Sequence, residues 1–164
     1  TGEELGLLGS NYYADHPLVP LDQTVFNLNT DGAGYNNTEY VSVVGFGRTG
    51  TDAAIEAAAA AAGLEVFPNP APEQNLFDRS DNVAFAKKGV PALTFSPGFT
   101  AFDETISKYY HQVADEADAV DMGYLLQYCR AYAHLARLIA DADERPQWKA
   151  GDKYEAAGKE LYKN

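Results

Sequence analysis

The segment Tyr40-Val41-Ser42-Val43-Val44-Gly45-Phe46 decides the fold class, because it is rich in the β-branched residues that favour a β-strand. An alanine-rich helix is expected directly after it over residues 50–63, with Gly63 at its carboxyl end. A second, short strand is expected over residues 64–67. A strand, a helix and a strand in immediate succession predict an α/β fold.

The same alternation continues on both sides of this unit. Periodicity predicts an early helix that Pro17 stops, a strand that ends at Asp31, a short helix closed by Gly89, a compact apolar strand, a polar loop and a long amphipathic helix. In that order, the ranges are 5–15, 24–31, 80–88, 91–95, 96–114 and 118–141. Because the elements alternate without repeats, we predict an α/β class with a mainly parallel or mixed sheet flanked by helices.

Composition bounds the kinds of partner. The chain of 164 residues is 46% hydrophobic, enough for one globular domain with its own core, and no apolar run approaches the roughly 20 residues that span a bilayer. A formal net charge of −12 argues against nucleic acid and against anionic membrane surfaces as partners. The single cysteine, Cys129, excludes an internal disulfide and a cysteine-based zinc cluster, and its helical setting predicts that it is buried.

The sequence pattern predicts a domain division near the carboxyl end and an incomplete amino end. We expect one domain over residues 1–145 and a polar tail over residues 146–164 that packs loosely on it. The chain has no initiator methionine, and a Glu-Glu turn of the kind at its start normally follows a buried strand. We therefore expect the chain to be the carboxyl-terminal part of a longer precursor.

The adjacent acids Glu3 and Glu4 stand on a glycine-flanked turn at the start of the chain. Neighbouring carboxylates repel, so a turn that directs both to one place suggests a cation between them. One carboxylate would bind a metal, and the other would accept a proton from the water that the metal activates. The alternative is that both acids favour the positive amino end of the following helix.

Asp31 and His111 are further candidates for a metal site. Asp31 ends the strand over residues 24–31, and ligands collect at the carboxyl ends of strands in α/β sheets. The alternative is a turn-forming aspartate that bonds its own backbone. His111 follows Tyr110 in a polar loop, where an imidazole is a good zinc ligand and a phenol can donate a hydrogen bond to an oxyanion. The other two histidines, His16 and His134, are expected to be structural.

One further segment, Phe77-Asp78-Arg79-Ser80-Asp81-Asn82, places an arginine among acids at the start of a helix. Ser80 or Asp81 is expected to cap that helix, while Arg79 and Asp78 could orient the polar terminus of a substrate. Taken together, the candidate residues supply carboxylate and imidazole ligands without thiolate, which suits zinc.

These segments resemble the secreted di-zinc aminopeptidases, a family whose relatives include plasma glutamate carboxypeptidase and the zinc glutaminyl cyclases. The resemblance rests on four segments in the family's order: Thr1 to Ser10, Asn27 to Asp31, Arg79 to Phe85 with Gly89 to Ala92, and Tyr110-His111 with Asp115.

The resemblance implies a zinc-exopeptidase-like fold and the zinc-dependent removal of amino-terminal residues from a peptide substrate. It implies that Glu3 is the general base and that Tyr110 stabilises the oxyanion. It also implies that Glu4 and His111 ligate one zinc and Asp31 a second, so that one or two ions bind. A secreted or periplasmic location is implied as well.

Arg79 and Phe99 are expected to border the substrate pocket, and two departures from the family pattern concern the rest of the site. Asn82 stands where the family usually has a histidine, and we expect this change to affect local packing. The family's His-x-Asp segment and its bridging carboxylate precede the Glu-Glu turn, so a missing amino-terminal segment of the same precursor is an expected partner.

Alternative functions stay open at this point. The chain could be a catalytically silent remnant that acts as a binding module, or a relative closer to the carboxypeptidases or glutaminyl cyclases. A third hypothesis, an amino-terminal-nucleophile hydrolase, rests on Thr1 alone.

Overall fold

The computed structural model describes residues 2–32 and 34–163. Its centre is a four-stranded sheet in the order β1-β4-β2-β3. The strands are β1 (Asn27–Asn29), β2 (Tyr40–Val44), β3 (Glu65–Pro68) and β4 (Ala92–Pro97). β1 runs parallel to β4 and β2 parallel to β3, while β2 and β4 are antiparallel. The predicted α/β class with a mixed sheet is therefore confirmed.

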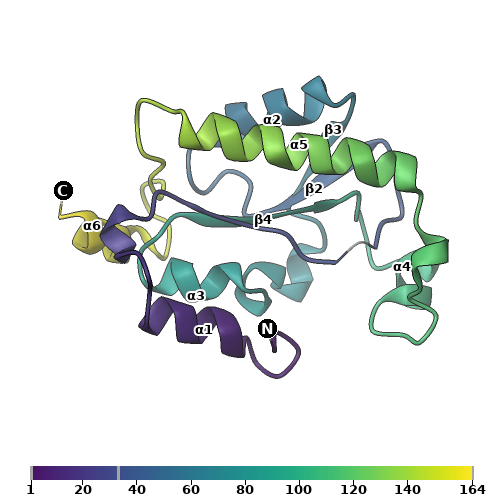
Figure 1. Cartoon of the computed structure of the whole chain (residues 1–164), viewed down its shortest axis with the longest axis horizontal. Helices are drawn as coiled ribbons and strands as arrows, with labels where there is room; N and C mark the ends of the chain where they lie inside the picture. The colour runs from purple at the N-terminus through teal and green to yellow at the C-terminus, as the bar shows by residue number, and fades with distance from the viewer. Residues whose placement is uncertain (1, 33, 164) are drawn as a thin grey trace.

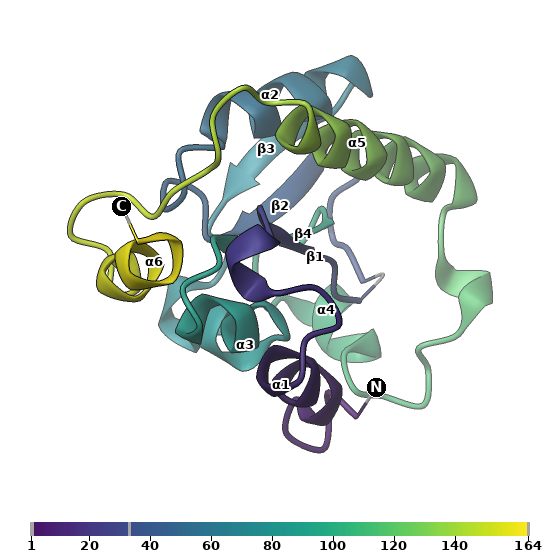
Figure 2. The same ribbon diagram turned by 60° about the vertical axis from the view of Figure 1, so that its left-hand side comes forward.

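Helices cover both faces of this sheet (Figures 1 and 2). α2 (Asp52–Ala61) and α5 (Met122–Ala140) lie over one face, and α1 (Leu8–Asp15) and α3 (Asn82–Lys87) lie over the other. The short helices α4 (Glu104–Tyr109) and α6 (Glu155–Tyr162) lie at opposite ends of the sheet, as Figure 1 shows. Four 3₁₀ turns complete the described elements: η1 (Leu21–Gln23), η2 (Pro72–Gln74), η3 (Leu76–Arg79) and η4 (Ala117–Ala119).

The main core lies between the sheet and the pair α2 and α5. Successive side chains of a strand point to opposite faces, so Leu93 and Phe95 enter this core while Ala92 faces the other layer. Ile55 of α2 and Leu135 of α5 fill the same core and are fully buried. In the part of the chain that the structure describes, no helix combines the length and apolar character needed to cross a membrane.

Three tyrosines on one face of α5, spaced four residues apart, connect this helix to three strands of the sheet. Each hydroxyl donates a hydrogen bond to a backbone carbonyl, which satisfies a polar group that the helix would otherwise bury. The pairs are Tyr124 with Tyr40 at 2.6 Å, Tyr128 with Phe95 at 2.7 Å and Tyr132 with Leu28 at 2.6 Å.

Two predictions in the carboxyl-terminal half are wrong. The loop expected over residues 96–114 contains α4, whose Asp103 Oδ1 accepts a hydrogen bond from the Ile106 amide at 2.9 Å and so caps the helix. Ile106 is the buried residue of this short helix. Cys129 is exposed rather than buried, because it lies on the outer side of α5.

The described part of the tail, residues 146–163, does not pack loosely. Trp148 and Tyr154 are buried with Phe77 in a second core cluster, and the Trp148 indole donates to the Gly89 carbonyl at 3.0 Å. Gly89 has φ of 96°, and a Cβ atom there would lie 2.4 Å from the Ala157 carbonyl oxygen, so α6 needs a glycine at this point. The division of the chain at residue 145 stays a prediction.

We expect Leu135→Ala to destabilise the fold by about 2–5 kcal/mol, because truncation leaves a cavity in a fully buried site. Leu126→Ala on the same helix removes a largely exposed side chain and should cost less than about 0.5 kcal/mol. Urea unfolding of both variants measures the difference. Equal losses in the two variants would contradict this account of the core.

A pH dependence is expected from Asp78. Burial opposes its ionisation, but hydrogen bonds from Lys153, Tyr154 and Asn75 outweigh burial and lower its pKa below the usual 3.8. The stabilisation from the ionised carboxyl is therefore complete above the unfolded-state pKa and is lost as pH falls through the lower, folded-state pKa. Melting temperatures from about pH 6 to about pH 2 should show a smaller acid-induced loss for Asp78→Asn than for the wild type. Parallel curves would argue against this assignment.

Candidate functional site

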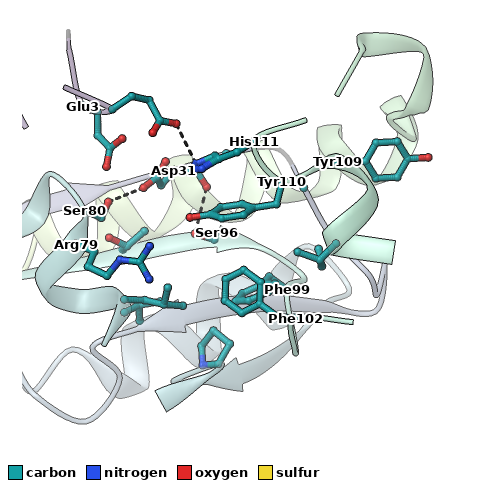
Figure 3. A pocket seen from close by; sticks show the side chains of 18 of the residues that line it. Glu3, Asp31, Arg79, Ser80, Ser96, Phe99, Phe102, Tyr109, Tyr110 and His111 are labelled. Carbon is teal, nitrogen blue, oxygen red and sulfur yellow. Dashed lines mark hydrogen bonds and ion pairs between the residues drawn. The ribbon is translucent and has the colours of Figure 1, made fainter. Parts of the chain in front are cut away.

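One cavity of about 540 Å³ opens where the carboxyl ends of β1 and β4 meet the loops before α1 and after α4 (Figure 3). This is the edge at which ligands collect in α/β sheets. Seven of the sequence-predicted site residues line it: Glu3, Glu4, Asp31, Arg79, Phe99, Tyr110 and His111. Asp78 does not line it, because its carboxylate binds Lys153 and Tyr154 instead. The structure therefore brings together side chains from distant parts of the chain.

The Glu-Glu turn precedes the first helix. The Glu3 carbonyl accepts hydrogen bonds from the amides of Gly6 and Leu7, both at 2.9 Å, and Leu7 has φ of 59°. The helix begins only at Leu8, with no acidic residue in its first turn. Glu3 and Glu4 therefore lie outside the first turn of this helix, and both line the cavity.

Negative charge gathers at this end of the cavity. Burial raises the pKa of the Glu3 carboxyl above its usual value, and repulsion from neighbouring carboxylates adds to the shift. These neighbours are Asp31, Glu4 and Asp81, while His111 acts in the opposite direction. The Glu4 carboxylate lies 3.0 Å from His111 Nε2, although both side chains are more than half exposed. A cation placed among these groups would relieve their repulsion.

An aromatic wall, formed by Phe99, Phe102, Tyr110 and His111, lines another part of the cavity. The Tyr110 and His111 rings are stacked with centroids 3.9 Å apart, and His111 has φ of 57°. This left-handed conformation is uncommon for a residue other than glycine, and such residues cluster at functional sites. Phe102 contacts Tyr110 edge-on at 5.3 Å and Phe99 at 4.9 Å. The wall thus joins the predicted oxyanion-stabilising phenol to an apolar surface.

The Asp31 carboxylate is oriented by Ser80, whose hydroxyl donates to Oδ2 at 2.6 Å. Ser80 in turn accepts a hydrogen bond from Asn29 Nδ2 at 2.9 Å. Asp81 occupies the position before α3, but its side chain makes no capping hydrogen bond. Asp81 is thus the N-cap residue, as one of the two expected alternatives, without a side-chain cap, while Ser80 belongs to the cavity.

A largely buried chain of polar side chains continues from Asn29 to the backbone of η3. Asn29 Nδ2 also donates to Thr94 Oγ1 at 3.0 Å, and Thr94 donates to Asn82 Oδ1 at 3.0 Å. Asn82 is fully buried and donates to the Phe77 carbonyl at 3.1 Å. Sequence reasoning identified Asn82 but missed Asn29 and Thr94. The sequence did hold a signal for Asn29. It stands two residues before Asp31, so the two side chains point to the same face of an extended segment.

The donor types in the cavity suit zinc, since they are carboxylates and one imidazole, with Glu4 and His111 already adjacent. Within residues 2–32 and 34–163, however, no three or more His, Cys, Asp or Glu side chains are grouped closely enough to hold an ion. The ligand roles of Glu4, Asp31 and His111 therefore stay predictions.

Comparison with known proteins agrees with this geometry. A model of peptidase family M28 matches residues 1–136. The chain belongs to peptidase family M28. No curated protein matches this M28 chain.

Solved structures of bacterial aminopeptidases share the M28 fold. The chain is similar to BSAP, a zinc aminopeptidase from Bacillus subtilis, in two structures with TM-scores of 0.62 and 0.63 at 23% and 24% identity. Both matches cover 93% of this chain and 36% of that protein. An aminopeptidase from Aneurinibacillus sp. strain AM-1 matches with a TM-score of 0.57 at 21% identity, over 90% of this chain and 32% of that one. The chain thus spans about a third of the length of these structures.

We expect Thr94→Val to destabilise this M28 chain by about 1–3 kcal/mol, because it leaves the buried Asn82 Oδ1 without its donor. The exposed Thr38→Val provides a matched control that should stay within about 0.5 kcal/mol of the wild type. Chemical denaturation measures both values. A Thr94→Val protein as stable as the control would exclude a structural role for the polar chain.

Proposed function

We propose that this chain carries catalytic residues of a zinc-dependent exopeptidase that removes amino-terminal residues from peptides. The observation that carries the proposal is that Glu3, Glu4, Asp31, Tyr110 and His111 line one cavity in a chain of family M28. This function fits the peptidase family, the oxygen and imidazole donors of the cavity, and the position of Glu3 as an acid suited to proton transfer.

Bound zinc would polarise the scissile carbonyl and lower the pKa of water toward about 7. Glu4, Asp31 and His111 are the residues that would hold it. Glu3 accepts a proton from the attacking water at its carboxylate and passes it to the leaving amine. The Tyr110 hydroxyl donates a hydrogen bond to the carbonyl oxygen as negative charge develops there.

The charge of the cavity favours a substrate's amino terminus over its carboxylate. Apart from the proposed zinc ligands, Glu3 and Asp115 offer carboxylates to an ammonium group, whereas Arg79 is the one guanidinium among the lining residues that the structure describes. We therefore prefer an aminopeptidase to the carboxypeptidase-like alternative. Phe99 and Phe102 would contact the substrate's side chain on the aromatic wall.

Completion of the site is part of the proposal. The chain spans about a third of the similar solved structures, and its described donors do not form a group of three. We infer that a further segment of the same precursor supplies the remaining ligands for one or two zinc ions. A secreted or periplasmic location stays a prediction from the family resemblance.

The experiment measures zinc binding and hydrolysis of an aminoacyl anilide by the precursor that contains this chain and by its variants. Glu3→Gln should lower kcat by about 10²–10⁴-fold while zinc still binds, because the amide cannot accept the proton. His111→Ala should weaken zinc binding, whereas His16→Ala, an exposed histidine outside the cavity, should leave it unchanged. Wild-type activity in Glu3→Gln would exclude the base role.

A second candidate is a catalytically silent peptide-binding module. It is favoured by one observation, the absence of a three-residue metal-holding group among the described residues. This alternative predicts peptide binding without zinc and no hydrolysis when zinc is supplied. The hypothesis that rests on Thr1 concerns a residue outside the described part of the chain.

A further inference from the structure

The tail, described over residues 146–163, contacts the 3₁₀ turn η3, which borders the cavity. The Tyr154 hydroxyl donates to Asp78 Oδ1 at 2.9 Å, and Lys153 Nζ contacts Asp78 Oδ2 at 2.5 Å. The Phe77 ring packs against Trp148 and Tyr154 with centroids 6.2 Å and 6.0 Å away. Two consecutive residues of η3 are thus held by the tail.

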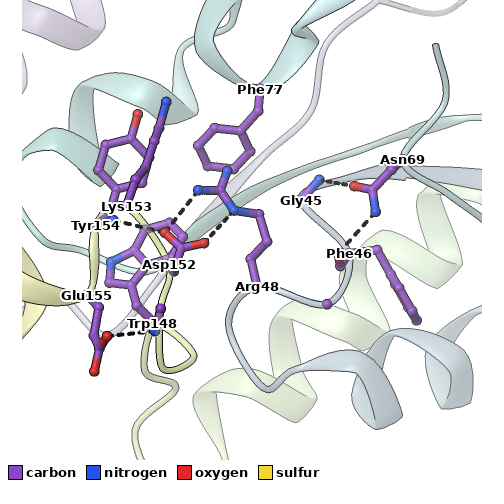
Figure 4. Close-up of polar contacts among 12 residues, drawn as sticks. Gly45, Phe46, Arg48, Asn69, Phe77, Trp148, Asp152, Lys153, Tyr154 and Glu155 are labelled. Atoms are coloured by element: carbon purple, nitrogen blue, oxygen red, sulfur yellow. Dashed lines mark hydrogen bonds and ion pairs between the residues drawn. The ribbon is translucent and has the colours of Figure 1, made fainter. Parts of the chain in front are cut away.

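Arg48 links the tail to the Phe77 ring of η3 (Figure 4). Its guanidinium lies 3.9 Å from the centre of the Phe77 ring and donates to both carboxylate oxygens of Asp152, at 2.7 Å and 3.0 Å. The Arg48 carbonyl also accepts a hydrogen bond from the Lys149 amide at 2.8 Å. Both side chains of the ion pair are mostly buried, so solvent screens it less than an exposed pair.

The turn η3 has little support of its own. It is four residues long, and the segment before it contains three non-glycine residues with positive φ: Asn69, Ala71 and Asn75. Short 3₁₀ turns have poor hydrogen-bond geometry, and residues in left-handed conformations persist where their surroundings hold them. The position of η3 therefore depends on what packs against it.

From η3 the contacts lead directly into the cavity. Arg79, its last residue, lines the cavity, and the next residue, Ser80, donates to the Asp31 carboxylate at 2.6 Å. The Phe77 carbonyl receives the hydrogen bond from Asn82 that ends the buried polar chain. A shift of η3 would thus displace Arg79 and reorient Asp31.

We propose that the tail is a positioning clasp, in which Arg48, Asp152 and Tyr154 hold η3 and so set the places of Arg79 and Ser80 in the cavity. The family model ends at residue 136, so this role belongs to a segment outside the matched region. The consequence for zinc binding rests on the proposed function, because it needs Asp31 to be a ligand. None of the clasp residues Arg48, Asp152 and Tyr154 lines the cavity.

The experiment compares two clasp variants with a control from the same tail. Tyr154→Phe removes only the hydroxyl that contacts Asp78, and Asp152→Asn weakens the hold on Arg48. Lys159→Gln breaks the exposed pair with Glu155 on α6 and makes no contact with η3. Hydrogen exchange followed by mass spectrometry should show severalfold faster exchange of residues 74–82 in both clasp variants, with β2 and β4 unchanged. The control should exchange like the wild type.

Metal binding gives a second measurement. We expect zinc to bind the clasp variants about tenfold more weakly, the lower end of the effect of residues that orient metal ligands. With cobalt(II) in place of zinc, the visible spectrum should change because it reports ligand geometry. If both clasp variants bind zinc as tightly as the wild type, the proposed effect of the tail on the metal site is wrong.

The two measurements separate the two proposals. Unchanged exchange at residues 74–82, or equal acceleration throughout the sheet, would overturn the clasp whatever zinc does. If neither the wild-type chain nor the longer precursor binds zinc, the proposed function is overturned, and the exchange pattern still decides whether the tail holds η3.

Discussion

The parallel register of β1 and β4 is the constraint on which the site depends. It sets Asn29 opposite Thr94, and their side chains hydrogen bond at 3.0 Å. From this pair one branch runs through Ser80 to Asp31 and the other through Asn82 to η3. A slip of one residue would turn each strand side chain to the opposite face and break both branches at once. The orientation of Asp31 is thus a property of the sheet.

The cavity has an acidic side and an aromatic side. Its acidic side concentrates carboxylates that repel, which the raised pKa of Glu3 reflects together with burial. Its aromatic side, from Phe99 to Tyr110, offers apolar contacts and two phenols, those of Tyr109 and Tyr110. An ammonium group or a metal ion suits the first side and an apolar side chain the second. This division is consistent with a peptide's amino-terminal residue as the ligand.

Much of the fold could be predicted because its elements follow local periodicity. The β-branched residues around Tyr40 to Val44 and the amphipathic pattern over residues 118–141 place the central strand β2 and α5 correctly within a few residues. α4 was missed because it is short and polar, and its start depends on a cap by Asp103 that has little periodic signal. The tail was misjudged because Trp148 and Tyr154 are isolated in a polar segment, and their burial depends on Phe77, far away in sequence.

The sequence by itself determined the α/β class, the candidate acids Glu3, Glu4 and Asp31, and the pairing of Tyr110 with His111, because strand and helix periods and residue chemistry are local properties. Only the tertiary structure decided that these residues share one cavity, that Ser80 orients Asp31, and that the tail supports η3. Those relations join residues 49 and 76 positions apart in the chain. No local pattern encodes such contacts, since they arise from strand register and from the packing of one layer on another.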